Sequence, residues 1–465
     1  MIRVVSAPWV LTGRSVRPLT PALSPLRGER EDPASSVSHL SEDPASTPVP
    51  LSPRTAGGEG QGEGGRAIPD GAVALEGDRI VAVGPRAELE ARYGAGERRE
   101  AILLPALVNA HLHLELSHMA GSVVGGEGLP SWIELFVSAR VRARERDPLP
   151  AMIMAAEDLV RAGVAAVGDV STTLASVAPI GDAGLAGTVF HEVFGTTPKR
   201  LAHAMADAQE ARRTAPAPAP GLRVVTSPHA IYSTFHAAVV ELLRAGPGSI
   251  HLAEDPAERA FVAHAAGGFA TLVARMGGRA EEIVPRARSA VALVAPHLAA
   301  HHLAVHCVDL DDEDVALLRA SGATVVLCPR SNAFIGGRLP RLDALLAAGV
   351  PLALGTDSLA SCPSLAPLAE AAALRRAFPA IAASRIVPLL WNGPAIGAPH
   401  VGALVPGVAP GLLAAPLRGA RVDDPFEALV AFGAEGRPFE WIARQDPSPE
   451  PSPGRGEGER DPRTP

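Results

Sequence analysis

The chain has 465 residues, 47% of them apolar, so it is long enough for two or three domains and apolar enough to bury a large core. Its formal net charge of −8, from 42 basic and 50 acidic residues, gives no electrostatic reason to expect a nucleic acid or an anionic membrane as partner. The single lysine, Lys199, lies in the context TTPKR, which fits neither a Walker A phosphate loop nor a Schiff-base site, so we exclude both.

Cysteine content and hydropathy bear on the compartment. The three cysteines, Cys307, Cys328 and Cys362, are an odd number in a long chain and do not suggest a disulfide framework. No stretch reaches 18 uninterrupted apolar residues, and the apolar run at the N-terminus is broken by Pro8. We therefore expect a cytoplasmic protein with neither a membrane span nor a signal peptide.

Two segments hold most of the excess of glycine (46 residues) and proline (45 residues): residues 17–66 and the tail 446–465. Both lack apolar periodicity, and they share similar stretches, SPLRGERE in the first and SPGRGEGER in the second. Such composition cannot bury enough apolar area to offset the entropy of ordering. We predict a disordered insert and a disordered tail without chemistry; the alternative is a partner-binding arm.

The rest of the chain has regular patterns of secondary structure. Residues 69–84, PDGAVALEGDRIVAVG, predict a β-hairpin that turns at EGD. From residue 101 onward, short apolar runs alternate with segments of helical period, which indicates repeated βα units. The predicted strands are 102–110, 164–170, 187–193, 222–228, 248–251, 303–307, 323–327 and 351–356. Eight such units predict an α/β fold of the (β/α)8 TIM-barrel type.

Polar residues of one kind fall at the ends of these strands, where barrels of this type place their chemistry. His111 and His113 stand two residues apart, so the period of a strand directs both imidazoles to the same side. His251, His306 and Asp357 end three later strands. These five metal-type residues are expected to converge.

A lone histidine is usually a hydrogen-bonded core or surface residue, but this group is different. Three imidazoles and a carboxylate, from His111, His113, His251 and Asp357, are ligands that Zn²⁺ accepts while leaving room for water. Glu254 follows His251 by three residues and is placed to exchange protons with such a water, although a helix-starting acid is the plainer explanation. We therefore predict a divalent metal site, with zinc expected and iron or manganese as alternatives.

Six segments in this order resemble the amidohydrolase superfamily, in its chlorohydrolase and aminohydrolase branch. They are LLPALVNAHLHLELS, SPHAIYS, IHLAEDPAE, AVHCVDLDD, CPRSN and GTDSLAS, within a match over about residues 68–410. The sequence is most similar to members that resemble aminofutalosine deaminases and methylthioadenosine or adenosylhomocysteine deaminases, with guanine deaminases and triazine hydrolases nearby.

The resemblance implies a domain organisation. It implies a metal-bearing barrel, here 104–394, flanked by a small β-sandwich built from both chain ends, here 1–16 with 67–103 and 395–445. Two departures from the family pattern stand out: Ile231 replaces a usual proline in SPHAIYS, and the late segment GVAPGLLAAPL lacks a usual acid, in the sandwich and away from the chemistry.

The resemblance also implies roles for individual residues. It makes His111, His113, His251 and Asp357 metal ligands and makes Glu254, His306 and Asp357 the catalytic group that moves protons and orients the attacking water. His229, on the fourth strand, would face the substrate, with a structural hydrogen bond as the alternative. Two-metal members carry a lysine where His229 stands, so we expect a single metal ion.

Specificity is predicted less directly. Candidate substrate-binding residues on strand-end loops are Glu115, Ser117, Trp132, Tyr232 and His229, and further polar residues there are His191, Glu192, Arg330, Ser331 and Asn332; packing and loop capping are the alternatives. The implied reaction is hydrolytic deamination of an aminopurine nucleoside such as aminofutalosine, with a place in menaquinone biosynthesis. The alternatives are a ring-amide hydrolase or a triazine-type chlorohydrolase, and, more remotely, a non-catalytic binding barrel. The expected partner is a small amino-heterocycle, and a homodimer is left open.

Overall fold

The computed structural model describes residues 1–14, 66–215, 217–419 and 421–444, which all belong to one compact unit. The predicted insert 17–66, apart from Arg66, and the predicted tail 446–465 lie outside these residues. Among the described residues, no helix combines the length and the apolar character that a membrane crossing needs.

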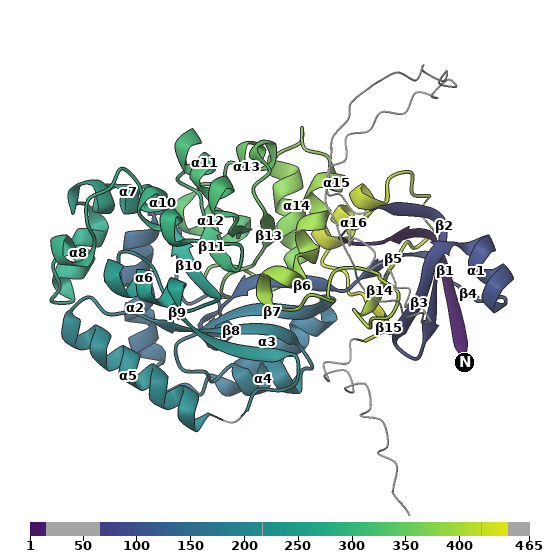
Figure 1. Cartoon of the computed structure of the whole chain (residues 1–465), viewed down its shortest axis with the longest axis horizontal. Helices are drawn as coiled ribbons and strands as arrows, with labels where there is room; N and C mark the ends of the chain where they lie inside the picture. Colours follow the sequence, from purple (N-terminus) through teal and green to yellow (C-terminus); the bar gives the residue numbers. More distant parts are fainter. Residues whose placement is uncertain (15–65, 216, 420, 445–465) are drawn as a thin grey trace, which may run out of the picture. The chain divides into compact units, whose positions relative to one another are not determined.

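Both ends of the described chain contribute to one seven-stranded sheet (Figure 1). Its strands are β1 (Ile2–Leu11), β2 (Ala67–Glu76), β3 (Arg79–Pro85), β4 (Glu97–Arg98), β5 (Ala101–Pro105), β14 (Leu412–Pro416) and β15 (Glu440–Ala443). They lie in the order β15-β14-β5-β1-β2-β3, with β4 paired to β1. The predicted hairpin is confirmed, because β2 and β3 pair antiparallel around a turn in which Gly77 has φ +59°.

Eight further strands form two four-stranded sheets in which all neighbours are parallel. The first sheet contains β6 (Leu107–Leu112), β7 (Val164–Ser171), β8 (Ala186–Val193) and β9 (Leu222–Pro228), and the second contains β10 (Gly248–Leu252), β11 (His302–His306), β12 (Thr324–Leu327) and β13 (Leu352–Leu354). Isolated parallel bridges join Ala230 to His251 and Leu112 to Asp357, so each sheet contacts the other at both of its edges. Each of these eight strands overlaps a predicted strand.

The first predicted strand, 102–110, is wrong as one continuous element. The structure divides it at Ala106 into β5, which belongs to the seven-stranded sheet, and β6, which begins the parallel series. Pro105 has no N–H to continue a ladder, and the Ala106 N–H donates to the carbonyl of Gly411 instead. The apolar run is unbroken because both strands are fully buried, so hydropathy could not mark the division.

Helices cover the parallel strands, with α3 on β7, α5 on β8 and α6 on β9 (Figure 1). The helices are α1 (Arg86–Tyr93), α2 (Leu129–Ala143), α3 (Leu149–Arg161), α4 (Val177–Asp182), α5 (Pro198–Thr214), α6 (His236–Arg244), α7 (Pro256–His264), α8 (Gly268–Arg275), α9 (Ala280–Ile283), α10 (Ala290–Val294), α11 (Asp312–Ser321), α12 (Pro329–Gly336), α13 (Leu342–Ala348), α14 (Pro367–Ala377), α15 (Ala383–Ile386) and α16 (Pro425–Ala434). Short 3₁₀ helices are η1 (Leu114–Met119), η2 (Ala295–His297), η3 (Val387–Trp391) and η4 (Gly393–Ile396).

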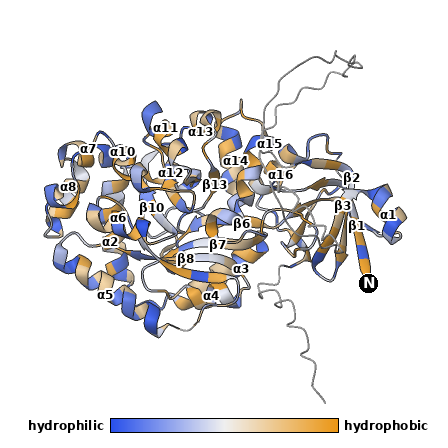
Figure 2. Ribbon diagram, viewed as in Figure 1, coloured by the Kyte–Doolittle hydropathy of each residue, from blue (hydrophilic) through white to orange (hydrophobic). Residues whose placement is uncertain are grey.

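Burial explains the continuous apolar character of the parallel strands. Every residue of β6, β7, β8, β10 and β11 is buried, as expected for strands covered on both faces. The covering helices alternate apolar and polar segments along their length (Figure 2), which fits helices with one face on the core. Polar residues buried at the strand ends, such as His111 and His306, are therefore exceptions that need an explanation.

Candidate metal centre

The predicted site residues come from the carboxyl ends of parallel strands. His111 lies in β6 and His113 directly follows it, His251 lies in β10, and His306 ends β11. Asp357 lies three residues beyond β13. The backbone has positive φ at His306 (+75°) and at Asp357 (+61°), a conformation that costs free energy for residues with a Cβ and that collects at functional sites.

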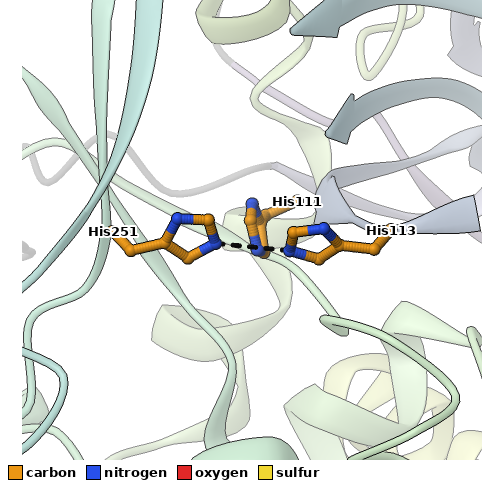
Figure 3. Close-up of side chains that lie close together, drawn as sticks. All are labelled: His111, His113 and His251. Carbon is orange, nitrogen blue, oxygen red and sulfur yellow. Dashed lines mark hydrogen bonds between the residues drawn. The ribbon is translucent and has the colours of Figure 1, made fainter. Parts of the chain in front are cut away.

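Three imidazoles meet in the centre of this arrangement (Figure 3). The Nε2 atoms of His113 and His251 lie 3.2 Å apart, and the ring centroid of His111 lies 4.9 Å from that of His113 and 5.0 Å from that of His251. Asp357 adds its Oδ1, at 3.5 Å from His113 Nε2 and 3.8 Å from His111 Nε2. We call these four residues the candidate ligand set.

His111 and His251 have the protonation states that a cation would need. Both ring nitrogens of His111 are buried without any hydrogen-bond partner, which is costly for a polar group. His251 Nδ1 lies 3.0 Å from the carbonyl of His229 and donates to it, because a carbonyl only accepts; its Nε2 therefore keeps a free lone pair. Burial lowers the pKa of both histidines well below the ordinary value, so both are neutral at pH 7. The candidate ligand set thus fits a divalent cation.

A second group lies beside the ligand set and contains Glu254, His306 and Asp357. His306 Nε2 lies 3.5 Å from Glu254 Oε2, and His306 Nδ1 lies 3.0 Å from Asn332 Nδ2. Burial, together with the charges of Asp357 and Glu258, raises the pKa of Glu254 well above its ordinary value. Burial lowers the pKa of His306 to about 4. Glu254 therefore favours its protonated form and His306 its neutral form.

Glu192 and His229 form a third group with His251. Glu192 Oε1 lies 3.5 Å from His251 Nδ1, and burial raises the pKa of Glu192 well above the ordinary value. Burial also lowers the pKa of His229 to about 3. From the sequence, Glu192 is one of several polar residues at strand ends. Its position at the end of β8, next to β9, which His229 directly follows, is the only available signal.

The carboxylate of Glu115, a candidate substrate contact, is engaged by its own chain. It accepts five hydrogen bonds from the last residue of β7 and the two residues that follow it, namely from the hydroxyls of Ser171, Thr172 and Thr173 and the backbone N–H groups of the two threonines. Burial acts to raise the pKa of Glu115, but these hydrogen bonds outweigh it and the pKa lies below the ordinary value. Ser117 donates to the carbonyl of Leu114 within η1. A substrate that reached either residue would compete with these bonds.

The two predicted aromatic contacts are placed by stacking. Trp132 is stacked on Phe136 at 5.1 Å between ring centroids, and its buried indole N–H has no hydrogen-bond partner. Tyr232 is stacked on Phe269 at 3.9 Å and meets the ring of His229 edge-on at 5.6 Å.

Hydroxyl and amide groups support the two catalytic candidates. Ser331 and Ser361 donate to Asp357 Oδ2 at 2.6 and 3.0 Å, and Asn332 contacts His306. Ser361 was missed from the sequence, although it follows Asp357 by only four residues in GTDSLAS. Its role depends on the left-handed turn at Asp357, which composition does not reveal.

Close backbone packing behind His111 leads to a testable prediction. A Cβ added at Gly355 would lie 2.7 Å from His111 Cβ and 2.8 Å from its carbonyl oxygen. We expect Gly355→Ala to displace His111, to destabilise the fold by about 1–3 kcal/mol and to weaken metal binding. Denaturant unfolding and metal titration would measure both effects. The control is Gly84→Ala, where an added Cβ meets nothing within 4 Å; equal metal affinity in the two variants would contradict the prediction.

Comparisons with known proteins agree with this geometry. The profile described as "Amidohydrolase family" matches residues 102–387, which is more than half of the chain. The chain belongs to the amidohydrolase family. A second profile, an imidazolonepropionase-like composite domain of bacteria, matches residues 71–95 of this amidohydrolase.

Curated relatives of the chain include two kinds of deaminase. An aminodeoxyfutalosine deaminase of Deinococcus radiodurans is 31% identical over 346 residues, which cover 69% of this chain and 79% of the relative. A 5-methylthioadenosine/S-adenosylhomocysteine deaminase of Syntrophobacter fumaroxidans is 29% identical over 316 residues, which cover 64% of this chain and 66% of the relative.

Solved structures support the fold of this amidohydrolase. The aminofutalosine deaminase of Helicobacter pylori superimposes with a TM-score of 0.71 at 19% identity, covering 94% of this chain and 97% of that one. Atrazine chlorohydrolase from Arthrobacter aurescens TC1, complexed with zinc, has a TM-score of 0.65 at 18% identity and covers 83% and 93%. The amidohydrolase thus has a mixed α/β fold of the TIM-barrel type.

Proposed function

We propose that this amidohydrolase is a metal-dependent deaminase of an aminopurine nucleoside, with an aminofutalosine-like nucleoside as the favoured substrate. The observation that carries the proposal is the meeting of three imidazoles and the Asp357 carboxylate beside a buried Glu254. The similarity to the Deinococcus aminodeoxyfutalosine deaminase supports the substrate class and, with it, a place in menaquinone biosynthesis. A non-catalytic barrel is disfavoured because a histidine or an aspartate, both of them metal-ligand types, stands at every predicted ligand position.

The proposal includes the architecture. We propose that the eight parallel strands close into a (β/α)8 barrel, 104–394, since the bridges Ala230–His251 and Leu112–Asp357 join both edges of the two sheets. The seven-stranded sheet, from 1–16, 67–103 and 395–445, is proposed as the flanking sandwich. Residues from six of its strands share one apolar cluster, which supports this assignment.

The candidate ligand set would hold one divalent ion, with zinc favoured by the zinc-containing structural neighbours and iron or manganese as alternatives. When bound, such an ion lowers the pKa of a coordinated water and so supplies a nucleophile at neutral pH. His113, His251 and His111 would present neutral nitrogens to it, and Asp357 a carboxylate oxygen.

The remaining steps belong to side chains of this chain. Glu254, whose pKa burial raises well above its ordinary value, is placed to donate a proton to the ring nitrogen of the substrate. The carboxylate of Asp357 accepts the proton of the attacking water. Neutral His306 orients that water with its Nε2–H, because its Nδ1 accepts from the amide of Asn332. The proton on Asp357 then passes to the leaving amine, and the tetrahedral carbon loses ammonia as its hydroxyl proton returns to Glu254 and the carbonyl forms. We propose that His229, Tyr232 and Trp132 contact the substrate, together with Glu115 and Ser117.

We expect one tightly bound metal ion per chain. A two-metal site of this family needs a bridging lysine at the position of His229, and Lys199 lies instead at the second residue of α5. Metal analysis of the purified protein by mass spectrometry would measure the ratio. A stoichiometry near two tightly bound ions per chain would refute this expectation.

An ammonia-release screen tests the function. The metal-loaded protein is offered aminofutalosine, adenosine, methylthioadenosine, adenosylhomocysteine and guanine, with a chelator-stripped sample as control. We expect release from a nucleoside and none after stripping. Turnover of a ring amide or a chlorotriazine, without ammonia from any purine, would favour the alternative hydrolase.

The proposal also covers the location of the protein and its partners. We propose a cytoplasmic location, which the three unpaired, buried cysteines support. A small amino-heterocycle is the proposed partner, and a homodimer stays a prediction.

A further inference from the structure

We infer that the buried ion pair between Arg330 and Glu370 is a positioning device, which holds the first turn of α12 so that Ser331 and Asn332 orient Asp357 and His306. Neither residue touches the ligand set directly. The inference rests on the proposed function, because it concerns the working geometry of that same site.

Arg330 connects two segments that α13 and β13 separate along the chain. Its Nε donates to Glu370 Oε1 at 2.6 Å, and its backbone N–H donates to Glu370 Oε2 at 2.9 Å. The rest of the guanidinium donates to the Oγ and the carbonyl of Ser364, at 3.1 and 2.7 Å, and to the carbonyl of Ala366 at 3.4 Å. Arg330 thus ties the first turn of α12 to α14 and to the loop before α14.

The pair is too buried to be a surface contact. The Glu370 side chain is 0% exposed and that of Arg330 is 16% exposed. Removing one partner from such a pair leaves an uncompensated buried charge and is strongly destabilising, whereas the pair as a whole adds little net stability. Its presence is better explained by the geometry it imposes.

The next two residues, Ser331 and Asn332, carry the position of this turn to the site. Ser331 donates to Asp357 Oδ2, the oxygen opposite the one that faces the histidines, and Asn332 contacts His306 Nδ1. Hydrogen bonds to a ligand carboxylate set its orientation. Removing such a bond typically lowers metal affinity or activity by about 10–100-fold. The amide of Asn332 donates to His306 Nδ1 and so fixes the proton of neutral His306 on Nε2, the nitrogen that faces Glu254.

Arg330→Lys tests this positioning role. Lysine keeps the charge but has no planar fork, so it cannot bond Glu370 and the 364–366 carbonyls together. We expect the metal dissociation constant to rise and kcat per folded molecule to fall by about 10–100-fold with little change in KM. Glu370→Gln is the second variant and is expected to act in the same direction.

The control is Arg375→Lys. Arg375, in the same helix as Glu370, pairs with Glu427 at 2.8 Å on the side of α16 and does not reach the site. Thermal unfolding of all variants corrects for the folded fraction. Metal affinity in Arg330→Lys and Glu370→Gln no weaker than in Arg375→Lys would overturn the inference.

A double-mutant cycle separates positioning from general loosening. If Arg330 acts through Ser331, Ser331→Ala should add little to the metal-affinity loss already caused by Arg330→Lys, whereas independent effects would add. Full additivity would therefore also overturn the inference. Metal binding is measured without substrate, so this test remains decisive even if the wild-type protein releases no ammonia and the proposed function fails.

Discussion

Glu254→Gln is expected to abolish most turnover while leaving the fold and the metal site intact. Glutamine has nearly the same shape as the buried carboxyl group but has no acidic proton to donate, and proton transfer by a positioned side chain contributes about 10²–10⁴-fold to rate. The backbone N–H of Glu254, which donates to Glu258, is unaffected by the change. Steady-state ammonia release measures the loss, and metal analysis and circular dichroism measure what is retained.

The matched control for this variant is Glu241→Gln, an exposed glutamate on α6. It makes the same carboxyl-to-amide exchange without touching the site, so its turnover should equal that of the wild type. A Glu254→Gln enzyme that kept wild-type turnover would remove Glu254 from the proton-transfer role. A variant that lost its metal together with its activity would instead assign Glu254 to holding the cation.

The strands and their chemistry could be predicted to different depths. Buried parallel strands are continuous apolar runs, and all eight were located, since hydropathy reports burial directly. The same property hid the division at Ala106, where both sides of the break are buried. Element boundaries depend on hydrogen-bond partners from distant segments, such as Gly411, and these are not visible in a local pattern.

The candidate site shows the same limit at the level of side chains. His111 and His113 are recognisable because their spacing matches the period of a strand, and Asp357 because it directly follows the predicted strand 351–356. The supporting contacts of Ser361 and Asn332 were not predictable in the same way. They depend on positive φ at Asp357 and His306, where the backbone leaves the regular strand geometry on which spacing arguments are based.

Removal of the metal is expected to destabilise the wild-type protein strongly, and His111→Ala should abolish that dependence. In the metal-free protein both nitrogens of His111 are buried without a partner, so the apo site carries the cost of unsatisfied polar groups. A ligand that binds only the folded state adds about 4 kcal/mol at a thousandfold excess over its dissociation constant. Thermal unfolding with and without zinc after chelation would measure the difference.

His302 provides the control, because it is an equally buried histidine whose nitrogens are both satisfied. Its Nδ1 accepts from the N–H of Ala299, and its Nε2 donates to the carbonyl of Leu243 at 2.8 Å. We expect His302→Ala to lower stability by the same amount with and without metal, leaving the zinc-dependent shift unchanged. His111→Ala should lose the zinc-dependent shift. When both proteins are metal-free, its stability should differ little from that of the wild type. The substitution removes two unsatisfied buried nitrogens together with the ring, and this gain offsets part of the lost packing. If zinc stabilised His111→Ala as much as the wild type, His111 could not be a ligand and the cation would have to sit elsewhere.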